Sequence, residues 1–316
     1  MATELELKLM VQPEHLASVG RYLNDYCAAS AEPKDAHQAT LDLMNGYYDT
    51  AEAKLMRNGI ALRIRAVNRE YIQTVKTRGS SRVGMHARDE WEWSLPSDAL
   101  DLSLLKEVPL PELLVDMAWS RDLIEVFRTD FKRDVWLIHY QGACIEVVAD
   151  QGEVSSQYGR DGICEVELEL KQGPEGALYA FATLMAEQVP MQVSTVSKAQ
   201  KGSRLQHRKI EFPDKPKAHA ELTRFAEYWY ETWLVYWEAM FYLHDEALLQ
   251  PVRSAVKQLR QCVAAELASE LQSLEQFYDE QLHQDSDDDL LARLASSPQT
   301  GLAMLAVGEW LNQQLN

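Results

Sequence analysis

The feature that most constrains this chain is a set of short segments in which apolar and charged residues alternate. Residues 4–8 read ELELK, and residues 164–171 read CEVELELK. Successive side chains of a strand point to opposite faces, so each segment has one apolar and one charged face. The same alternation recurs in four further segments, 61–65, 71–76, 90–94 and 144–149. Strands are therefore predicted through the first two thirds of the chain.

Helical patterns lie between the strands and fill the last third. We expect helices over 13–28, 99–118 and 176–189. From about residue 218 the chain has no glycine until Gly301, and its apolar spacing is helical. The segment 212–217, FPDKPK, has two prolines and is typical of a linker. The predicted class is α+β followed by an all-α part, with a strand domain at 1–205, a linker at 206–217 and a helical domain at 218–316.

Charge and composition exclude several classes of protein. The 316 residues carry 31 Lys and Arg against 49 Asp and Glu, a net charge of −18. Bulk attraction to nucleic acid or to anionic lipid is therefore not expected, and an anionic ligand needs a local basic site. No apolar run approaches the roughly 20 residues of a membrane span. Four scattered cysteines form no CxxC pair, and the N-terminus lacks a secretory pattern, so we expect a cytoplasmic protein.

The charged faces carry rows of one sign. A sheet with one solvated face is the ordinary explanation for any single strand. The opposite faces, however, are rich in Leu, Ile, Val and Trp, as expected of surfaces covered by helices. If helices cover the outside, the charged faces must look inward. A closed antiparallel barrel of roughly eight strands with a polar lumen satisfies both conditions.

The charges of such a lumen suit a phosphorylated ligand. Buried like charges are tolerated only when they are paired or neutralised by a metal ion. Carboxylates favour Mg²⁺ or Mn²⁺, while lysine and arginine bind phosphate oxygens. The lumen is therefore predicted to bind a polyphosphate with a divalent metal.

The motifs occur in an order that resembles a known family. The ELELK start is similar to the ExExK signature of the CYTH superfamily, also called triphosphate tunnel metalloenzymes. Further matching elements follow in order at 47–50, 62–65, the strand ending at Lys76, 88–92, 129–133, 149–152, 164–169, 197–198 and 201–202. The resemblance covers about residues 1–205.

The resemblance implies an eight-stranded antiparallel tunnel with flanking helices that binds a triphosphate and one or two metal ions. The implied metal ligands are Glu4, Glu6, Glu165, Glu167 and Glu169. The implied substrate-binding residues are Lys8, Arg63, Arg65, Lys76, Arg78, Arg133 and Lys198. Glu90, Glu92, Glu146 and Asp150 are further lumen acids, although Arg78 and Glu146 are equally well explained as an ordinary lumen ion pair. The implied catalytic set is Glu4, Glu6, Lys8, Glu167 and Glu169.

The resemblance also suggests an activity. We expect Mg²⁺- or Mn²⁺-dependent hydrolysis of inorganic triphosphate to pyrophosphate and phosphate. The alternatives are a thiamine triphosphatase, a class IV-type adenylyl cyclase, or a noncatalytic organophosphate-binding module. The expected partner is a small molecule that contains a triphosphate, with neither nucleic acid nor membrane involved.

The helical part resembles a degraded start of the CHAD domain. Residues 217–316 carry 6 Lys and Arg against 16 Asp and Glu, so polyphosphate binding is not expected of them. A scaffold role or a homodimer contact is the predicted function. The aromatic stripe that begins at Phe225 and ends at Trp237 is predicted to be helix core.

Overall fold

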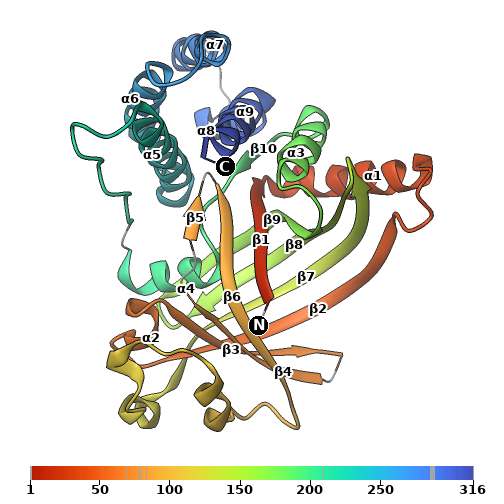
Figure 1. Cartoon of the computed structure of the whole chain (residues 1–316), viewed down its shortest axis with the longest axis vertical. Helices are drawn as coiled ribbons and strands as arrows, with labels where there is room; N and C mark the ends of the chain where they lie inside the picture. Colours follow the sequence, from red (N-terminus) through yellow and green to blue (C-terminus); the bar gives the residue numbers. More distant parts are fainter. Residues whose placement is uncertain are drawn as a thin grey trace.

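A closed ring of antiparallel strands forms the first two thirds of the molecule (Figure 1). The computed structural model describes residues 2–68, 70–77, 80–82, 84–208, 210–284 and 289–315, except for the side chains of 2–4, 80–82 and 86–88. Going round the ring, the strands are β1 (Ala2–Val11), β9 (Gly159–Gln172), β8 (Ala143–Ser156), β7 (Ile124–Tyr140), β2 (Ala36–Asp49), β3 (Ile60–Val67), β4 (Glu70–Thr77) and β6 (Met85–Leu95). Strand β6 then pairs with β1. The predicted eight-stranded tunnel is therefore confirmed.

Strand β1 closes the ring because its two halves pair on different sides. Residues Ala2 to Leu7 pair with β6, and Glu6 to Met10 pair with β9. Beyond the end of β6, strand β10 (Met191–Val193) pairs with Leu9 to Val11. The short strand β5 (Ser80–Arg82) pairs with β6. The ring is thus completed by hydrogen bonds on both edges of its first strand.

Helices cover the apolar outer face of the ring. The described helices of the first part are α1 (Pro13–Ala29), α2 (Lys54–Arg57), α3 (Gly176–Gln188) and α4 (Lys198–His207). Those of the second part are α5 (Leu222–Leu243), α6 (Leu249–Arg260), α7 (Ala265–His283), α8 (Leu290–Ala295) and α9 (Pro298–Leu315). The predicted helices at 13–28 and 176–189 and the all-helical second part are confirmed. Within the described residues, no helix is both long enough and apolar enough to cross a bilayer.

The helix predicted over 99–118 is wrong. The structure has three separate 3₁₀ turns here, η1 (Leu102–Glu107), η2 (Glu112–Leu114) and η3 (Ala118–Asp122). Pro109 and Pro111 lie between the first two turns. Proline lacks the N–H of a helical hydrogen bond and disfavours helical backbone at the preceding residue, so one continuous helix cannot form.

The outer face of the tunnel and the helical part share one hydrophobic core. Leu7 and Leu168 of the tunnel and Trp233 and Trp237 of α5 are fully buried members of the same cluster. Figure 1 shows α5, α6, α7 and α9 gathered at one end of the molecule, with α9 beside β10. The predicted aromatic stripe is therefore core at its most buried positions. The domain boundaries, with the linker at 206–217, remain a prediction.

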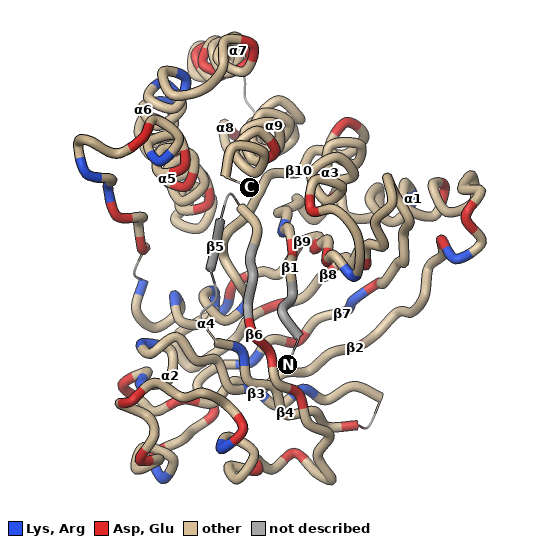
Figure 2. Tube along the Cα trace, viewed as in Figure 1, with Lys and Arg blue, Asp and Glu red and all other residues tan. Residues whose placement is uncertain are grey.

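Two arginines of helix α6 pair with acids of helix α7. Arg253 of α6 pairs with Asp279 of α7, and Arg260 Nε lies 2.7 Å from a carboxylate oxygen of Glu275. In Figure 2 the basic positions of this part lie mainly on α6, and acidic positions mark α5 and α7.

Candidate functional site

Strand register brings the acidic rows and the basic rows together inside the tunnel. Lys8 of β1 lies directly opposite Glu167 of β9, and Glu6 lies opposite Glu169. On the next two strands, Asp150 lies opposite both Glu165 and Arg133. Directly opposite residues of an antiparallel pair point to the same face, so these side chains share the lumen.

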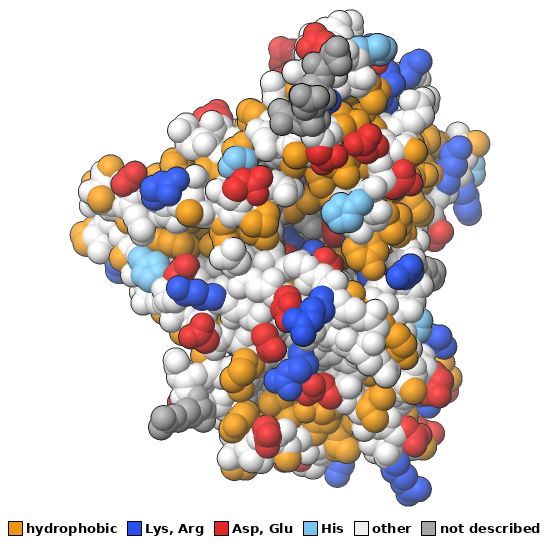
Figure 3. Space-filling view, turned by 180° about the vertical axis from the view of Figure 1, so that it is seen from behind, with side chains coloured by type: hydrophobic (Ala, Val, Ile, Leu, Met, Phe, Trp, Pro, Cys, Tyr) orange, Lys and Arg blue, Asp and Glu red, His pale blue; other side chains and the backbone are white. Residues whose placement is uncertain are grey.

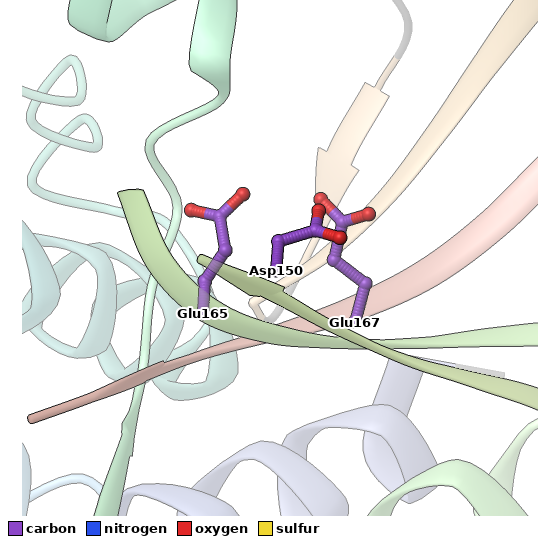
Figure 4. Close-up of side chains that lie close together, drawn as sticks. All are labelled: Asp150, Glu165 and Glu167. Carbon is purple, nitrogen blue, oxygen red and sulfur yellow. The ribbon is translucent and has the colours of Figure 1, made fainter. Parts of the chain in front are cut away.

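Three carboxylates form the centre of one wall. Oxygen atoms of Asp150, Glu165 and Glu167 lie within 4.8 Å of one another. Figure 4 shows Glu165 and Glu167 on one strand and Asp150 on its neighbour, with all three side chains pointing to the same side. Asp150 and Glu165 are almost completely buried. Such a cluster requires compensating positive charge.

Three cations supply that charge. Arg133 donates from Nε and Nη2 to the two carboxylate oxygens of Asp150, both at 2.7 Å, and from Nη2 to Glu167 at 2.8 Å. Lys198 Nζ lies 2.6 Å from Asp150 and 3.1 Å from Glu167, and it also contacts Glu165. Lys8 Nζ lies 3.1 Å from Glu165 and contacts Glu167. We call Lys8, Arg133, Lys198 and the three carboxylates the acid wall.

Lys8, Lys198 and Glu167 of the acid wall stabilise one another in their charged forms. Burial acts to lower the pKa of Lys8, but the charges of Glu165 and Glu167 outweigh it and raise that pKa. The pKa of Lys198 is raised in the same way, with Asp150 as its largest favourable partner. Burial acts to raise the pKa of Glu167, but Lys198, Lys8 and Arg133 hold it well below its ordinary value. Each charge therefore depends on its neighbours.

Strands β3, β4 and β6 form a second wall with fewer compensating acids. Lys76 Nζ lies 3.2 Å from Glu90, and Arg63 Nη2 lies 3.5 Å from the same carboxylate. Arg65 Nε donates to the side-chain oxygen of Asn45 at 3.2 Å, and no carboxylate among the described residues forms an ion pair with it. Thr74 donates to Glu92 at 3.2 Å. We call Arg63, Arg65 and Lys76 the cation wall.

The cation wall has hydrogen-bond donors to spare. Nε and Nη2 of Arg63 are buried without a hydrogen-bond partner among the described residues. The positive charge of Arg63, followed by burial and then Arg133, lowers the pKa of Arg65 to about 10. Crowded guanidinium groups with free donors favour an anion that accepts several hydrogen bonds.

The walls enclose a cavity of about 270 Å³. Its lining includes these residues proposed from the sequence: Glu6, Lys8, Arg63, Arg65, Lys76, Glu90, Glu92, Arg133, Glu146, Glu167, Glu169 and Lys198. Glu165 and Asp150 lie behind this lining, in contact with Lys198. The side chain of Glu4 and the whole of Arg78 lie outside the described residues. On the face seen in Figure 3, acidic and basic side chains lie in and below a hollow between the two parts of the molecule.

Sequence reasoning missed several lining residues. Tyr47 accepts a hydrogen bond from Arg63 Nη1 at 3.4 Å and stacks on Phe127. Burial acts to raise its pKa, but the charge of Arg63 outweighs this and lowers it. The ring of Phe131 lies 4.9 Å from Lys198 Nζ. Tyr47 and Phe131 lie inside the motifs 47–50 and 129–133, and their place in these motifs could have identified them as lining residues.

Lys171 also lines the cavity. It lies 2.8 Å from Glu169 and 3.2 Å from Glu146, which makes Glu146 one partner of an ion-pair network. Its parity with the three glutamates of β9 places it on the charged face that the alternation predicts to look inward, although no role was assigned to it from the sequence.

The acid wall has the oxygen ligands that a divalent cation requires. Carboxylate oxygens are the ligands that Mg²⁺ and Mn²⁺ prefer, and Asp150, Glu165 and Glu167 offer three within one ion's reach. The same oxygens now face Lys8, Lys198 and Arg133, so a bound ion would compete with these cations. Glu6 of β1 lies opposite Glu169 of β9. This pair is two residues along each strand from the pair formed by Lys8 and Glu167.

Comparison with known proteins gives matches over the tunnel. The family model described as the CYTH domain matches residues 2–203. An inorganic triphosphatase of Haemophilus influenzae is 32% identical over 207 residues, which are 64% of this chain and 54% of that protein. The chain thus spans about half the length of that relative.

Solved structures with lower similarity were also found. One is a protein from Hippeastrum, described as a proposed adenylyl cyclase with a dominant triphosphatase activity. It is 20% identical, with 66% of this chain and 97% of that chain covered and a TM-score of 0.45. Another is a Mimivirus capping enzyme triphosphatase, which is 10% identical with a TM-score of 0.33, and the match covers 58% of this chain and 89% of that chain.

Proposed function

This chain belongs to the CYTH family, and from that premise we propose that it hydrolyses inorganic triphosphate to pyrophosphate and phosphate with Mg²⁺ or Mn²⁺. The inorganic triphosphatase relative supports this choice of substrate. The observation that carries the proposal is the cation wall, where, among the described residues, two buried donors of Arg63 have no hydrogen-bond partner and Arg65 forms no ion pair.

The two walls of the tunnel bind such a substrate from different sides. Arg63, Arg65 and Lys76 bind phosphate oxygens from one side of the cavity. Lys8, Arg133 and Lys198 present positive charge from the acid wall. Arg78 and Glu4 belong to the same proposal as a phosphate ligand and a metal ligand. A substrate held between two charged walls loses little entropy on the way to the transition state.

The catalytic demand is charge neutralisation. Phosphoryl transfer spreads negative charge over the transferred oxygens and the leaving diphosphate, and fixed cations stabilise it without a covalent nucleophile. When bound by carboxylates drawn from Glu4, Glu6, Glu165, Glu167 and Glu169, with Asp150 beside them, a divalent metal would supply further neutralisation and substrate orientation. Glu90, Glu92 and Glu146 keep the lumen close to neutral overall, so that its cations stay tolerable when no substrate is bound.

The helical part has a structural role in this proposal. Its basic residues Arg253 and Arg260 already pair with acids of α7, which leaves little positive charge for a polyphosphate. The resemblance to CHAD and a homodimer contact through this part remain predictions.

A turnover panel tests the proposed function. Phosphate release is measured side by side from triphosphate, ATP, thiamine triphosphate and long-chain polyphosphate, each with Mg²⁺, with Mn²⁺ and with chelator. We expect triphosphate to be hydrolysed fastest and the chelator to stop the reaction. Production of cyclic AMP in excess of phosphate would replace the proposal with a cyclase. Tight triphosphate binding without metal-dependent turnover would replace it with a noncatalytic binding module.

A further inference from the structure

A buried carboxylate of the helical part reaches back to the tunnel. Glu238 lies on α5 among the aromatic core residues, and only 6% of its surface is exposed. A charged side chain in such a place is costly unless it is paired and hydrogen-bonded. Its two oxygens accept from Arg204 Nη1 at 3.0 Å and from Ser194 Oγ at 2.9 Å. Both partners belong to the segment that leads into and forms α4, and neither belongs to the helical part.

Arg204 fixes one end of α4. Arg204 is 8% exposed, and its Cζ lies 5.1 Å from the centre of the Tyr242 ring on α5. The hydroxyl of the same tyrosine donates to the Arg204 carbonyl at 3.2 Å. Two residues of α5 therefore hold the side chain and the backbone of a single residue near the C-terminal end of α4.

The other end of α4 carries a lysine of the acid wall. Ser197 begins the helix with a capping box to Gln200, which sets the direction of the first turn. Lys198 follows at once and reaches the carboxylates of Asp150 and Glu167. Lys198 and Arg204 are six residues apart, so roughly 9 Å of helix joins the tunnel charge to the α5 contact.

Ser194 provides a second connection to the acid wall. Its backbone N–H donates to the Lys8 carbonyl at 2.9 Å, while its hydroxyl donates to Glu238. Lys8 is the second lysine of the acid wall. Glu238 on α5 is thus connected to both lysines of the acid wall. Ser194 links it to the backbone of Lys8, and Arg204 links it through helix α4 to Lys198.

The packing leaves α4 little freedom to compensate. A Cβ added at Gly202 would lie inside van der Waals distance of the Phe127 ring, so the helix already touches β7 at closest approach. A shift at the Arg204 end cannot be absorbed by moving α4 deeper into the sheet. Such a shift would instead be passed along the rigid helix toward Lys198.

We infer that Glu238 is a positioning residue for the tunnel, which sets the placement of Lys198 through Arg204 and α4. The inference rests on the proposed function for its effect on catalysis. It gives the helical part a specific role, because Glu238 of that part fixes the position of Lys198 in the substrate cavity. The Glu238→Gln variant keeps the size of the side chain and one acceptor for Ser194, but it leaves the buried Arg204 opposite a neutral amide.

The experiment is a double-mutant cycle between Glu238→Gln and Lys198→Ala, with KM and kcat for triphosphate measured at saturating metal. If Glu238 acts through Lys198, Glu238→Gln should raise KM by about tenfold in the natural background and by less than about twofold when Lys198 is already alanine. The milder Ser194→Ala, which keeps the Arg204 pair, should raise KM by a smaller factor. An equal effect of Glu238→Gln in both backgrounds would overturn the inference.

Tyr278→Phe is the matched control. It removes another buried hydrogen bond of the helical part, from Tyr278 to Thr300 Oγ1 at 3.0 Å, which connects α7 with α9 and does not involve α4. We expect Tyr278→Phe to lower the melting temperature and leave KM unchanged. The same rise in KM in this variant would mean that general loosening of the helical part explains the effect, and the inference would be wrong.

Amide hydrogen exchange gives a measurement that does not depend on turnover. Glu238→Gln should speed exchange in α4 over Lys198 to His207 more than in α9, whereas Tyr278→Phe should show the reverse. If the natural chain failed to hydrolyse triphosphate, the proposed function would fall, and this comparison would still decide the positioning claim. Unchanged exchange in α4 of Glu238→Gln would refute it.

Discussion

Glu167 is the residue on which the charges of the acid wall converge. It contacts Lys8, Lys198 and Arg133 at once. Glu167→Gln keeps the size of the side chain and removes its charge, so we expect kcat for triphosphate to fall by about a hundredfold or more while metal-free binding of triphosphate largely survives on the cation wall. Turnover and calorimetric titration measure the two effects separately. Glu153→Gln changes a partly exposed acid of β8 that pairs with Arg160; it is the control and should behave like the natural protein. Near-normal turnover of Glu167→Gln at low metal would show that the acid wall is structural.

The same residue predicts how stability depends on pH. The pKa of Glu167 in the folded chain is far below the value of about 4.3 expected when it is unfolded. Its stabilising contribution is therefore present above that unfolded value and is lost as pH falls through the folded value. Urea unfolding should show Glu167→Gln less stable than the natural protein at pH 7, with the difference shrinking as pH falls below about 4. A difference that stays constant from pH 7 to pH 3 would mean that the carboxylate carries no net stabilising charge.

Individual elements show where sequence reasoning succeeds. The segments of β1 and β9 were predictable because their apolar residues keep strict parity along the strand, and the structure buries Leu7 and Leu168 while Glu6 and Glu167 line the cavity. Strands β2 and β7 have no such clean alternation. Their pairing contains register shifts near His37 and between Tyr47 and Tyr48, and each bulge moves the following side chains to the other face.

The contacts within the site could not be predicted from any single segment of the sequence. The acid row of β9 was visible in the sequence, but its meeting with Asp150 depends on the register of β8 against β9. Likewise, Lys198 comes from a helix far along the chain, and only the resemblance to the family marked it before the fold was known. Side-chain parity within one strand is local, whereas cross-strand register and helix placement are set by the packing of the whole ring.

The two parts of the molecule pack tightly against each other where α9 meets β10. Helix α9 lies on β10 so closely that a Cβ added at Gly301 would overlap the Met191 carbonyl oxygen. Tyr230 of α5 donates to the Met304 carbonyl at 2.9 Å, and Met191 is completely buried. A methyl group at Gly301 must push α9 away from the sheet that carries β1, so the cost should reach both parts.

We therefore expect Gly301→Ala to destabilise the protein by about 2 kcal/mol, even though alanine favours a helix more than glycine does. Gly176→Ala, at the start of α3, is the matched control, because nothing lies within 4 Å of the added Cβ and the change should be neutral or slightly stabilising. Urea unfolding followed both by tryptophan fluorescence, to which each part of the chain contributes four of the eight tryptophans, and by far-ultraviolet circular dichroism gives the measurement. Because one hydrophobic core joins the tunnel to α5 and α9, the two signals should shift together in Gly301→Ala. Two separate transitions, of which only one is shifted in Gly301→Ala, would mean that the helical part unfolds independently and that the shared core does not couple it to the tunnel.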